Sequence, residues 1–182
     1  AKAVGDSLGV ETCFATPGWD TLTAGNWGDR WDISVGSMAQ TSERSKVINF
    51  SEPYYYAYAY IAVPADSTAA SMADLAGTTG CVGSATIYES WLNGDLANDK
   101  FVIVNSAPPG DVTVQSQETD NLCIEALAAG RSWDFFVQSD AFIDNAIAET
   151  DTVDEATGEV TASKLKYLDN VAVTAEKISV AL

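Results

Sequence analysis

Short apolar runs alternate with segments of helical periodicity along this chain, and that alternation constrains the fold most strongly. An apolar run at residues 56–63 precedes another at 81–83, which leads into a helix-like segment at 85–92. The same order recurs where residues 135–137 precede residues 141–148. Strands that alternate with helices are typical of α/β proteins with parallel pairing. We therefore predict an α/β fold with mixed, mostly parallel sheets.

Turn residues and periodicity predict further elements. Residues 151–163 are polar and acidic, which is typical of an exposed hairpin tip or a disordered loop. A helical face that starts at Leu122 ends at Gly130. Further strands are predicted at residues 10–14, 31–35, 101–104, 165–168 and 178–182.

Two stretches, residues 28–35 and 130–137, share one pattern, in which glycine and arginine are followed by Trp-Asp and three strand residues. One interpretation is a common helix-to-strand loop that occurs twice. The other is a pair of lobes with similar topology whose strands end at one cleft, because ligands in open α/β sheets bind at the carboxyl ends of strands. Both interpretations stay open on the sequence alone.

The chain carries a large excess of negative charge. Its 182 residues include 26 Asp and Glu but only 9 Lys and Arg, which gives a net charge of −17. The cations are scattered rather than gathered in a stripe, and this argues against nucleic acid and against an anionic membrane surface as partners. The longest apolar stretch, residues 54–65, is too short to span a bilayer.

Histidine is absent from the sequence. Nucleophile–imidazole pairs and histidine metal sites are therefore excluded, and any enzyme would have to use carboxylates, Lys, Tyr or Cys. For the function given below, we predict no catalytic residue, no metal site and no cofactor. Three cysteines, Cys13, Cys81 and Cys123, allow one disulfide and one thiol, or three thiols. The chain does not open on a charged-then-apolar leader, so we expect that a signal peptide has been removed or lies outside this sequence.

One segment carries a specific signature. Residues 31–44 read WDISVGSMAQTSER, and residues 47–55 read VINFSEPYY. The order D-I-x-x-G, T-x-E-R and F-S-x-P-Y resembles the family 3 extracellular solute-binding proteins, which are polar amino-acid-binding components of ABC importers. The sequences ADLAG at residues 73–77 and GSAT at residues 83–86 fit the same family, so the resemblance covers nearly the whole chain.

The resemblance implies a two-lobed fold of the periplasmic-binding-protein type II, or Venus-flytrap, class. Members of the family have a first strand before the position of Ala1 and closing helices after that of Leu182, so both ends are expected to be clipped. The implied division is residues 1–62 and 172–182 in lobe 1 and residues 63–171 in lobe 2, with hinge strands near residues 60–63 and 170–175.

An arginine just after a predicted strand is a candidate for binding a carboxylate. An amino-acid ligand presents such a group, which the planar, bidentate guanidinium holds best. Arg30 and Arg131 fall in predicted exposed loops, which leaves Arg44. The resemblance assigns Arg44 the same role, as the clamp on the ligand α-carboxylate. The alternative is a surface arginine that pairs with Glu43 or Glu52.

The resemblance adds further ligand-binding positions in lobe 1. Trp19 stands where the family has an aromatic ring stacked on the ligand, and a ring face also suits an ammonium group. The alternative for Trp19 is ordinary core packing. Backbone groups at Ser37 and Ala39, with Met38 between them, correspond to those that accept from the ligand ammonium and donate to its carboxylate. Many members have Ser or Thr where this chain has Ala39, so this chain lacks a side-chain hydroxyl at that position but keeps the backbone N–H.

In lobe 2, Gly83, Ser84 and Thr86 correspond to a phosphate-loop-like turn that offers amides and hydroxyls to the ligand carboxylate, although Ser84 also fits a helix cap. The family often has an Asp after the next strand to hold the ligand ammonium. That position is Ser139 here, and Asp140 follows it. Either Ser139 takes a weaker polar role, or Asp140 binds through a local shift, or both only begin the next helix.

The cysteines divide between the lobes. Cys81 and Cys123 fall at apolar positions of a strand and a helix in lobe 2. Some members of the family join similar positions by a disulfide, which an exported protein permits. The alternative is two buried thiols. With the disulfide formed, we expect Cys13 to be a free thiol, buried in a strand of lobe 1.

The resemblance implies that the chain binds a small polar amino acid or related zwitterion in an interlobe cleft and delivers it to an ABC-transporter permease, with ligand contacts stabilising the closed state. We expect a monomer in the periplasm or outside the cell. A lipid anchor, if the protein has one, is expected on a segment before residue 1. Two alternatives are the ligand-sensing ectodomain of a receptor and a dehydratase-like enzyme on the same fold. For the enzyme, Asp140 and Glu89 are the weak candidates for a general acid or base.

Overall fold

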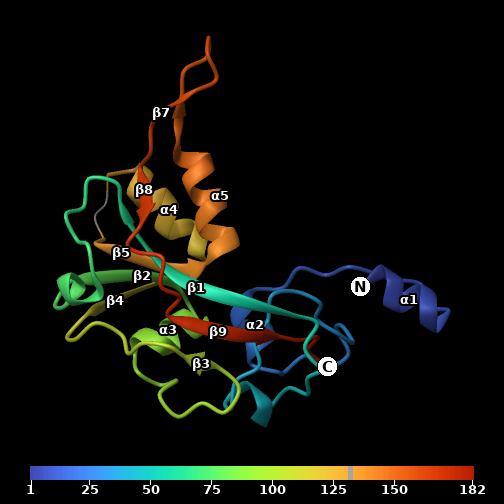
Figure 1. The fold of residues 1–182 in the computed structure, drawn as a ribbon. Coiled ribbons are helices and arrows are strands. Elements are labelled where there is room, and N and C mark those ends of the chain that lie inside the picture. Colours follow the sequence, from blue (N-terminus) through green and yellow to red (C-terminus); the bar gives the residue numbers. More distant parts are fainter. Residues whose placement is uncertain (131–132) are drawn as a thin grey trace. The chain divides into compact units, whose positions relative to one another are not determined.

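The computed structural model describes residues 1–130 and 133–182, and the chain divides into two units, whose course Figure 1 shows. Arg131 and Ser132, in the second of the two stretches that share a pattern, lie outside the described residues. Unit 1 comprises Ala1–Tyr56, Lys100–Val102 and Glu176–Leu182, and unit 2 comprises Ala57–Asp99 and Ile103–Ala175.

Unit 1 consists of short helices and loops around a small aromatic core. Its helices are α1 (Lys2–Leu8), α2 (Trp19–Thr23) and the 3-10 helix η1 (Arg44–Lys46). Segments far apart in the sequence meet in the core, so the unit depends on the C-terminal residues of the chain. The core contains buried Trp27, Met38, Ile48 and Ala181, with Trp19, Leu22, Trp31 and Phe50 packed against them.

Backbone pairing within unit 1 is sparse. Ser34 and Ala181 exchange two hydrogen bonds of 2.9 and 3.0 Å, but they form an isolated bridge. The predictions of strands at residues 31–35 and 178–182 were therefore wrong, and residues 10–14 also lie outside helices and strands. Apolar alternation gives a strand only where a second strand lies alongside and shares its backbone hydrogen bonds.

Cys13 is exposed and lies outside helices and strands, so the expectation of a buried thiol in a strand was wrong. The residue does remain a free thiol, as expected. Its neighbours Val10 and Phe14 are 58% and 75% exposed, which shows that no packed layer covers this segment of unit 1.

The exposure of Cys13 leads to a labelling prediction. Iodoacetamide should modify one thiol per chain in the folded, unreduced protein, because Cys13 is exposed whereas Cys81 and Cys123 are bonded to each other. Intact mass should show three modified thiols only after unfolding and reduction. Labelling of the folded protein at more than one site would contradict this assignment.

Unit 2 holds most of a seven-stranded mixed sheet, in the order β3-β9-β1-β5-β2-β4, with β8 paired to β1. The strand β2 pairs in parallel with β4 and β5, whereas β1 pairs antiparallel with β5 and β8, and β3 with β9. The mixed α/β fold is confirmed, although the parallel share is smaller than the sequence suggests. The strands are β1 (Tyr55–Pro64), β2 (Thr79–Gly83), β3 (Ile103–Val104), β4 (Thr113–Gln117), β5 (Phe135–Ser139), β8 (Leu165–Tyr167) and β9 (Thr174–Ile178).

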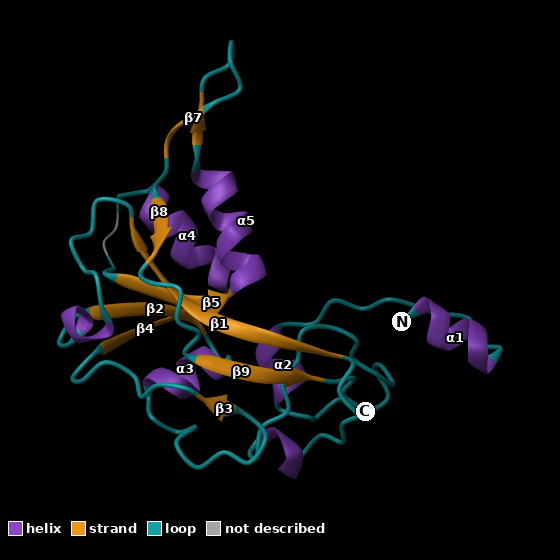
Figure 2. Cartoon of the chain, in the orientation of Figure 1, coloured by secondary structure: helices purple, strands orange, loops and turns teal. Residues whose placement is uncertain are grey.

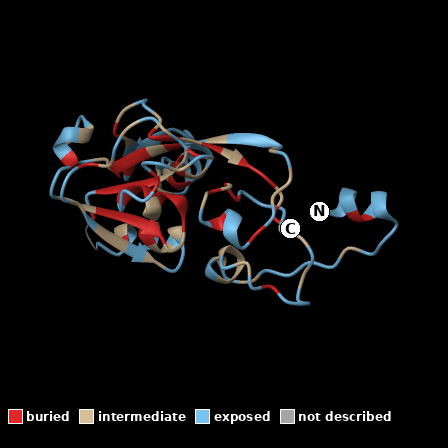
Figure 3. Cartoon of the chain, turned by 90° about the horizontal axis from the view of Figure 1, so that it is seen from below, coloured by how far each residue is buried: buried red, intermediate tan, exposed pale blue. Residues whose placement is uncertain are grey.

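Helices cover both faces of this sheet. Figure 2 shows α4 (Asp120–Ala128) and α5 (Asp140–Thr150) on one side and α3 (Ile87–Leu92) on the other. A short 3-10 helix, η2 (Met72–Leu75), precedes β2. The central strands are buried on both faces, as Figure 3 shows, which is why they read as continuous apolar runs.

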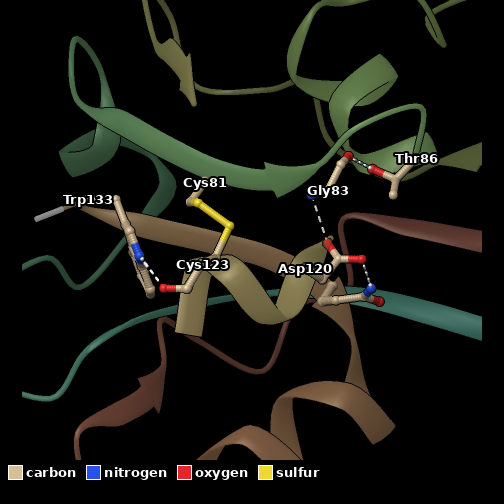
Figure 4. The surroundings of a disulfide bond; sticks show 7 residues. Cys81, Gly83, Thr86, Asp120, Cys123 and Trp133 are labelled. Carbon is tan, nitrogen blue, oxygen red and sulfur yellow. Dashed lines mark hydrogen bonds between the residues drawn. A yellow bond between two sulfur atoms is a disulfide. The ribbon is translucent and has the colours of Figure 1, made fainter. Parts of the chain in front are cut away.

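A disulfide joins β2 to α4 through Cys81 and Cys123, as expected for this pair. Both residues are fully buried in the core between the sheet and the helices α4 and α5. Trp133 packs in the same core, and its ring N–H donates to the Cys123 carbonyl at 2.9 Å. Covalent, apolar and hydrogen-bond contacts therefore fix the first turns of α4 on the sheet (Figure 4).

The acidic segment forms an exposed hairpin of β6 (Thr152–Val153) and β7 (Val160–Ala162), one of its two predicted forms. Backbone amides of Ala156 and Thr157 donate to the Asp154 carboxylate at the tip and lower its pKa. Among the described residues, no helix has both the length and the apolar character needed to cross a membrane.

Candidate ligand-binding site

Arg44 lies at the start of η1 in unit 1 and is 8% exposed. Its Nη1 donates to the Ala39 carbonyl at 2.8 Å, and its guanidinium carbon lies 5.4 Å from the centre of the Trp19 ring. Its backbone N–H donates to the Thr41 hydroxyl at 3.1 Å, which fixes the start of the helix. The structure thus brings together Arg44, Trp19 and Ala39, three of the predicted ligand-binding residues. Glu43 instead pairs with Lys46 at 2.6 Å.

Trp19 takes part in core packing and also contacts Arg44, while its predicted stacking on a ligand stays a prediction. The ring is half-buried and packs against the core that contains Trp27 and Met38, as ordinary core packing requires. The same ring also lies under the Arg44 guanidinium, at a distance typical of a cation–π contact. Core packing therefore orients the ring, and the ring in turn orients the arginine.

Ser37 and Met38 differ in what they offer. The Ser37 hydroxyl is exposed and shares a 2.6 Å hydrogen bond with the Tyr55 hydroxyl. Met38 is fully buried, and its carbonyl accepts from the Ser179 amide at 3.2 Å. Tyr54 donates from its hydroxyl to the Gly36 carbonyl, and burial together with the neighbouring Tyr55 raises the pKa of Tyr54. This tyrosine pair next to the predicted positions was not found from the sequence.

In unit 2, the carboxyl ends of three strands meet at one edge of the sheet. Because β2 runs parallel to both β4 and β5, Gly83, Gln117 and Ser139 end their strands on the same side. The helices α3, α4 and α5 begin just after these ends, so their amide-rich first turns lie there too. Ligands of open α/β sheets bind at this kind of edge.

The turn between β2 and α3 is held by its own hydrogen bonds. Thr86 is the N-cap of α3, donating to the Gly83 carbonyl at 2.7 Å and accepting from the Glu89 amide at 3.2 Å. The alternative of Ser84 as the cap was therefore wrong. Ala85 adopts a left-handed φ of 56°, and its amide donates to the Glu89 carboxylate at 2.7 Å. This backbone path moves the start of the helix two residues beyond the predicted one.

Two serine hydroxyls remain available at this edge. The Ser84 amide donates to the Gln117 carbonyl at 2.6 Å, but within the described residues its hydroxyl forms no hydrogen bond. Ser139 is the N-cap residue of α5, and its side chain makes no capping bond. Asp140 is exposed, and its carboxylate accepts from the Ala141 amide at 2.8 Å, as a first-turn acid does.

Asp120, at the start of α4, belongs to this edge and was missed from the sequence. Its Oδ1 accepts from the Gly83 amide at 2.8 Å and its Oδ2 from the Gln138 side-chain amide at 3.0 Å. Burial raises the pKa of Asp120, while these two donors oppose the shift. Figure 4 shows the carboxylate pointing toward Gly83. The available signal was a polar pair, Thr119-Asp120, between an alternating run and an apolar helical face.

A polar hollow of about 370 Å³ lies elsewhere in unit 2, next to the amino ends of β2 and β5. The carboxylates that line this hollow already accept hydrogen bonds from the backbone. Asp134 accepts from the Thr79 amide at 2.8 Å, and Asp74 caps η2, where the amides of Ala70 and Ser71 lower its pKa. We therefore place the candidate site at the carboxyl ends of the strands. The hollow is lined by Ser67, Thr68, Ala69, Asp74, Leu75, Thr78 and Asp134.

The structure thus has polar groups at the ends of parallel strands in unit 2 and a buried arginine on an aromatic ring in unit 1. Residues 1–173 match the family model of the bacterial extracellular solute-binding proteins, family 3. The chain belongs to this family.

Solved structures show the same fold over the whole chain. An ancestral arginine-binding protein bound to glutamine superposes with a TM-score of 0.74 at 21% identity, covering 100% of this chain and 70% of that one. Holo ArgBP from T. maritima gives 0.73 at 22% identity, covering 100% and 69%. The arginine-, lysine-, histidine-binding protein ArtJ from Geobacillus stearothermophilus gives 0.74 at 20%, covering 100% and 69%. The fold is thus of the periplasmic-binding-protein type II class.

Two kinds of curated relative match part of the chain. The L-cystine-binding protein TcyJ of Escherichia coli K12 is 27% identical over 131 residues, which is 71% of this chain and 49% of that protein. The membrane-bound lytic murein transglycosylase F of Desulfosudis oleivorans is 36% identical over 93 residues, which is 50% of this chain and 20% of that protein. The chain therefore spans half or less of the length of these relatives.

Proposed function

We propose that the chain binds a small polar amino acid or related zwitterion and that Arg44 holds the α-carboxylate. The observation that carries this proposal is the buried guanidinium, fixed between the Ala39 carbonyl and the Trp19 ring. The five N–H groups of a guanidinium lie in one plane, and two parallel N–H groups at its edge match the two oxygens of a carboxylate. A guanidinium whose plane is already set loses little freedom when it binds such a ligand.

We propose further ligand contacts in unit 2. The Ser84 and Ser139 hydroxyls supply polar contacts, and Thr86 holds the turn that carries Ser84. We propose that one ligand molecule is contacted by both groups of residues and stabilises a closed state, with β1 and β9 as the hinge strands because each is shared by the two units.

Names of relatives support the ligand class. Relatives of similar fold are named for arginine, lysine and histidine, and a curated relative is named for L-cystine. We propose delivery of the amino acid to an ABC-transporter permease by a monomer, outside the cytoplasmic membrane, as fits a family of extracellular solute-binding proteins. We also propose that the chain binds its ligand without transforming it. The two acids considered for catalysis, Glu89 and Asp140, accept hydrogen bonds at helix starts.

Thermal unfolding with a panel of amino acids tests this function. L-arginine, L-glutamine and L-cystine are the first probes. At a concentration of about 100 Kd, a bound ligand adds about 2.7 kcal/mol to the free energy of unfolding. For a chain of this size that raises the melting temperature by about 5–10 °C. If no amino acid raises the melting temperature, the proposed function is wrong.

Arg44→Lys tests the carboxylate clamp. Lysine keeps the positive charge but lacks the planar fork, so we expect the ligand-induced rise in melting temperature to shrink as Kd increases by about 10- to 100-fold. Each variant is compared with its own ligand-free melting temperature. Arg30→Lys is the matched control, because Arg30 is exposed and donates to the loop carbonyls of Trp27 and Asn26. An unchanged ligand response in Arg44→Lys would refute the clamp.

A further inference from the structure

Residues 35–37 form a bulge in the backbone of unit 1. An isolated antiparallel bridge joins Ser34 to Ala181, and a second one joins Ala39 to Ile178. Between these bridges one side advances by five residues and the other by three, so two extra residues lie on the first side. The backbone groups of a bulge have no partners in the pairing, and other contacts must therefore hold it in one position.

Two tyrosine hydroxyls hold this bulge. The Tyr54 hydroxyl donates to the Gly36 carbonyl, and the Tyr55 hydroxyl shares a hydrogen bond of 2.6 Å with the Ser37 hydroxyl. Within the described part of the chain, no other hydrogen bond reaches residues 35–37. The position of the bulge therefore depends on these two side chains.

The two tyrosines are themselves fixed in place. The Tyr54 amide donates to the Ile178 carbonyl at 2.9 Å, and the centres of the Tyr54 and Tyr55 rings are 5.0 Å apart. Burial and the neighbouring Tyr55 raise the pKa of Tyr54, so its hydroxyl keeps the proton that it donates. Tyr56, the next residue, is 58% exposed, and among the described residues its hydroxyl has no hydrogen-bond partner. Three consecutive tyrosines thus differ in whether they contact the bulge.

The bulge leads directly into the residues that hold Arg44. Two positions beyond Ser37, the Ala39 carbonyl accepts from the Arg44 Nη1 at 2.8 Å. The backbone amide and carbonyl of Ser37 form no hydrogen bond with the residues that the structure describes. Both groups are therefore available to a ligand bound at Arg44.

We propose that Tyr54 and Tyr55 are positioning residues for ligand binding in unit 1, an inference that rests on the function proposed above. Their hydroxyls hold the bulge so that the Ser37 backbone, one of the predicted ligand-binding positions, meets the ligand in a preset arrangement. A segment that is already fixed loses little conformational freedom on binding, and this raises affinity. The tyrosines act through the bulge and need no contact with the ligand themselves.

Tyr54→Phe and Tyr55→Phe test the inference in the whole chain. Each variant keeps the ring and loses one hydroxyl, so the ligand must order a looser bulge, and we expect Kd to rise by about 5- to 10-fold. The readout is the calorimetric Kd of whichever of L-arginine, L-glutamine and L-cystine binds the unmodified chain, at a temperature where every variant is folded. Tyr56→Phe is the matched control and should leave Kd unchanged, because the hydroxyl that it removes does not contact the bulge.

The ligand-free melting temperature separates positioning from stability. If Tyr54→Phe and Tyr55→Phe melt at a lower temperature but bind with the Kd of the unmodified chain, the hydroxyls serve stability alone and the inference is wrong. A higher Kd for both variants, with no such change in Tyr56→Phe, would support it.

A double variant tests whether Tyr55 acts through the bulge. Ser37→Ala and Tyr55→Phe remove opposite ends of one hydrogen bond, so Ser37→Ala/Tyr55→Phe should bind the ligand about as well as either single variant. Losses in affinity that add in the double variant would mean that the two hydroxyls act independently, which would overturn the role proposed for Tyr55.

The two proposals fail in different ways. If the unmodified chain binds no amino acid, the proposed function fails and the role of the tyrosines fails with it. If the chain binds an amino acid and Arg44→Lys weakens that binding while Tyr54→Phe and Tyr55→Phe do not, only the inference about the tyrosines is wrong.

Discussion

Replacing both Cys81 and Cys123 with alanine should lower the free energy of unfolding by about 4 kcal/mol. The two residues are 42 positions apart, so the disulfide closes a long loop and restricts the unfolded chain substantially. Their side chains are fully buried, and the smaller alanines leave the surrounding core slightly underpacked. For this chain length, we expect the melting temperature to fall by about 10 °C, measured alongside urea unfolding under oxidising conditions.

Two controls isolate the contribution of the bond. Cys13→Ala should leave stability unchanged, because that thiol is exposed and unbonded. Reduction of the original chain should produce nearly the same loss as the double alanine variant. Equal urea midpoints for the oxidised, reduced and double-alanine proteins would show that the disulfide does not contribute to stability.

Phe135→Ala should cost about 3–5 kcal/mol, because a fully buried aromatic ring in the centre of the sheet is removed. The ring packs on Gly80 of the neighbouring parallel strand, where an added Cβ would lie 2.5 Å from the ring Cζ. Gly80→Ala should therefore cost about 1–3 kcal/mol through overpacking. Urea unfolding of each variant measures both losses of unfolding free energy.

The combination of these two substitutions gives the sharper result. In Gly80→Ala/Phe135→Ala the new methyl group enters space that the ring has left, so the cost of Gly80→Ala should largely disappear. Gly110→Ala serves as the control, because an added Cβ there meets no atom within 4 Å. Additive costs in the double variant would indicate that the ring and the glycine are not in close contact.

The sequence predicts those parts of the fold that are determined by nearby residues. The helices α4 and α5 were found at almost their observed bounds, because each has a repeating apolar face and a polar start. The hairpin of β6 and β7 was one of two predicted forms. The strands predicted in unit 1 were not found, because an alternating run such as residues 10–14 has the same appearance whether or not a partner strand lies beside it.

The residues of the candidate site likewise differ in whether the sequence alone predicts them. Arg44 was identified because few arginines exist here and because a carboxylate ligand requires that chemistry. Asp120 was missed, because one of many acids in an acidic chain becomes distinctive only when the register of β2 and β5 is known. The cap at Thr86 likewise depends on the left-handed turn at Ala85, which no residue preference predicts.

The path of the chain through unit 2 suits the exchange of this part of the sequence between related proteins. The stretch of residues 57–175 belongs to unit 2 except for Lys100–Val102, and it begins in β1 and ends in β9, which are neighbours in one sheet. The Val173 amide donates to the Ala59 carbonyl at 2.8 Å, so the entry and exit of the segment are side by side. In genetic terms, this stretch of chain resembles an insertion whose two ends already meet, and inserted modules of this kind are tolerated well. Exchange of that segment between relatives would alter Asp120 and its neighbours while leaving Arg44 in place.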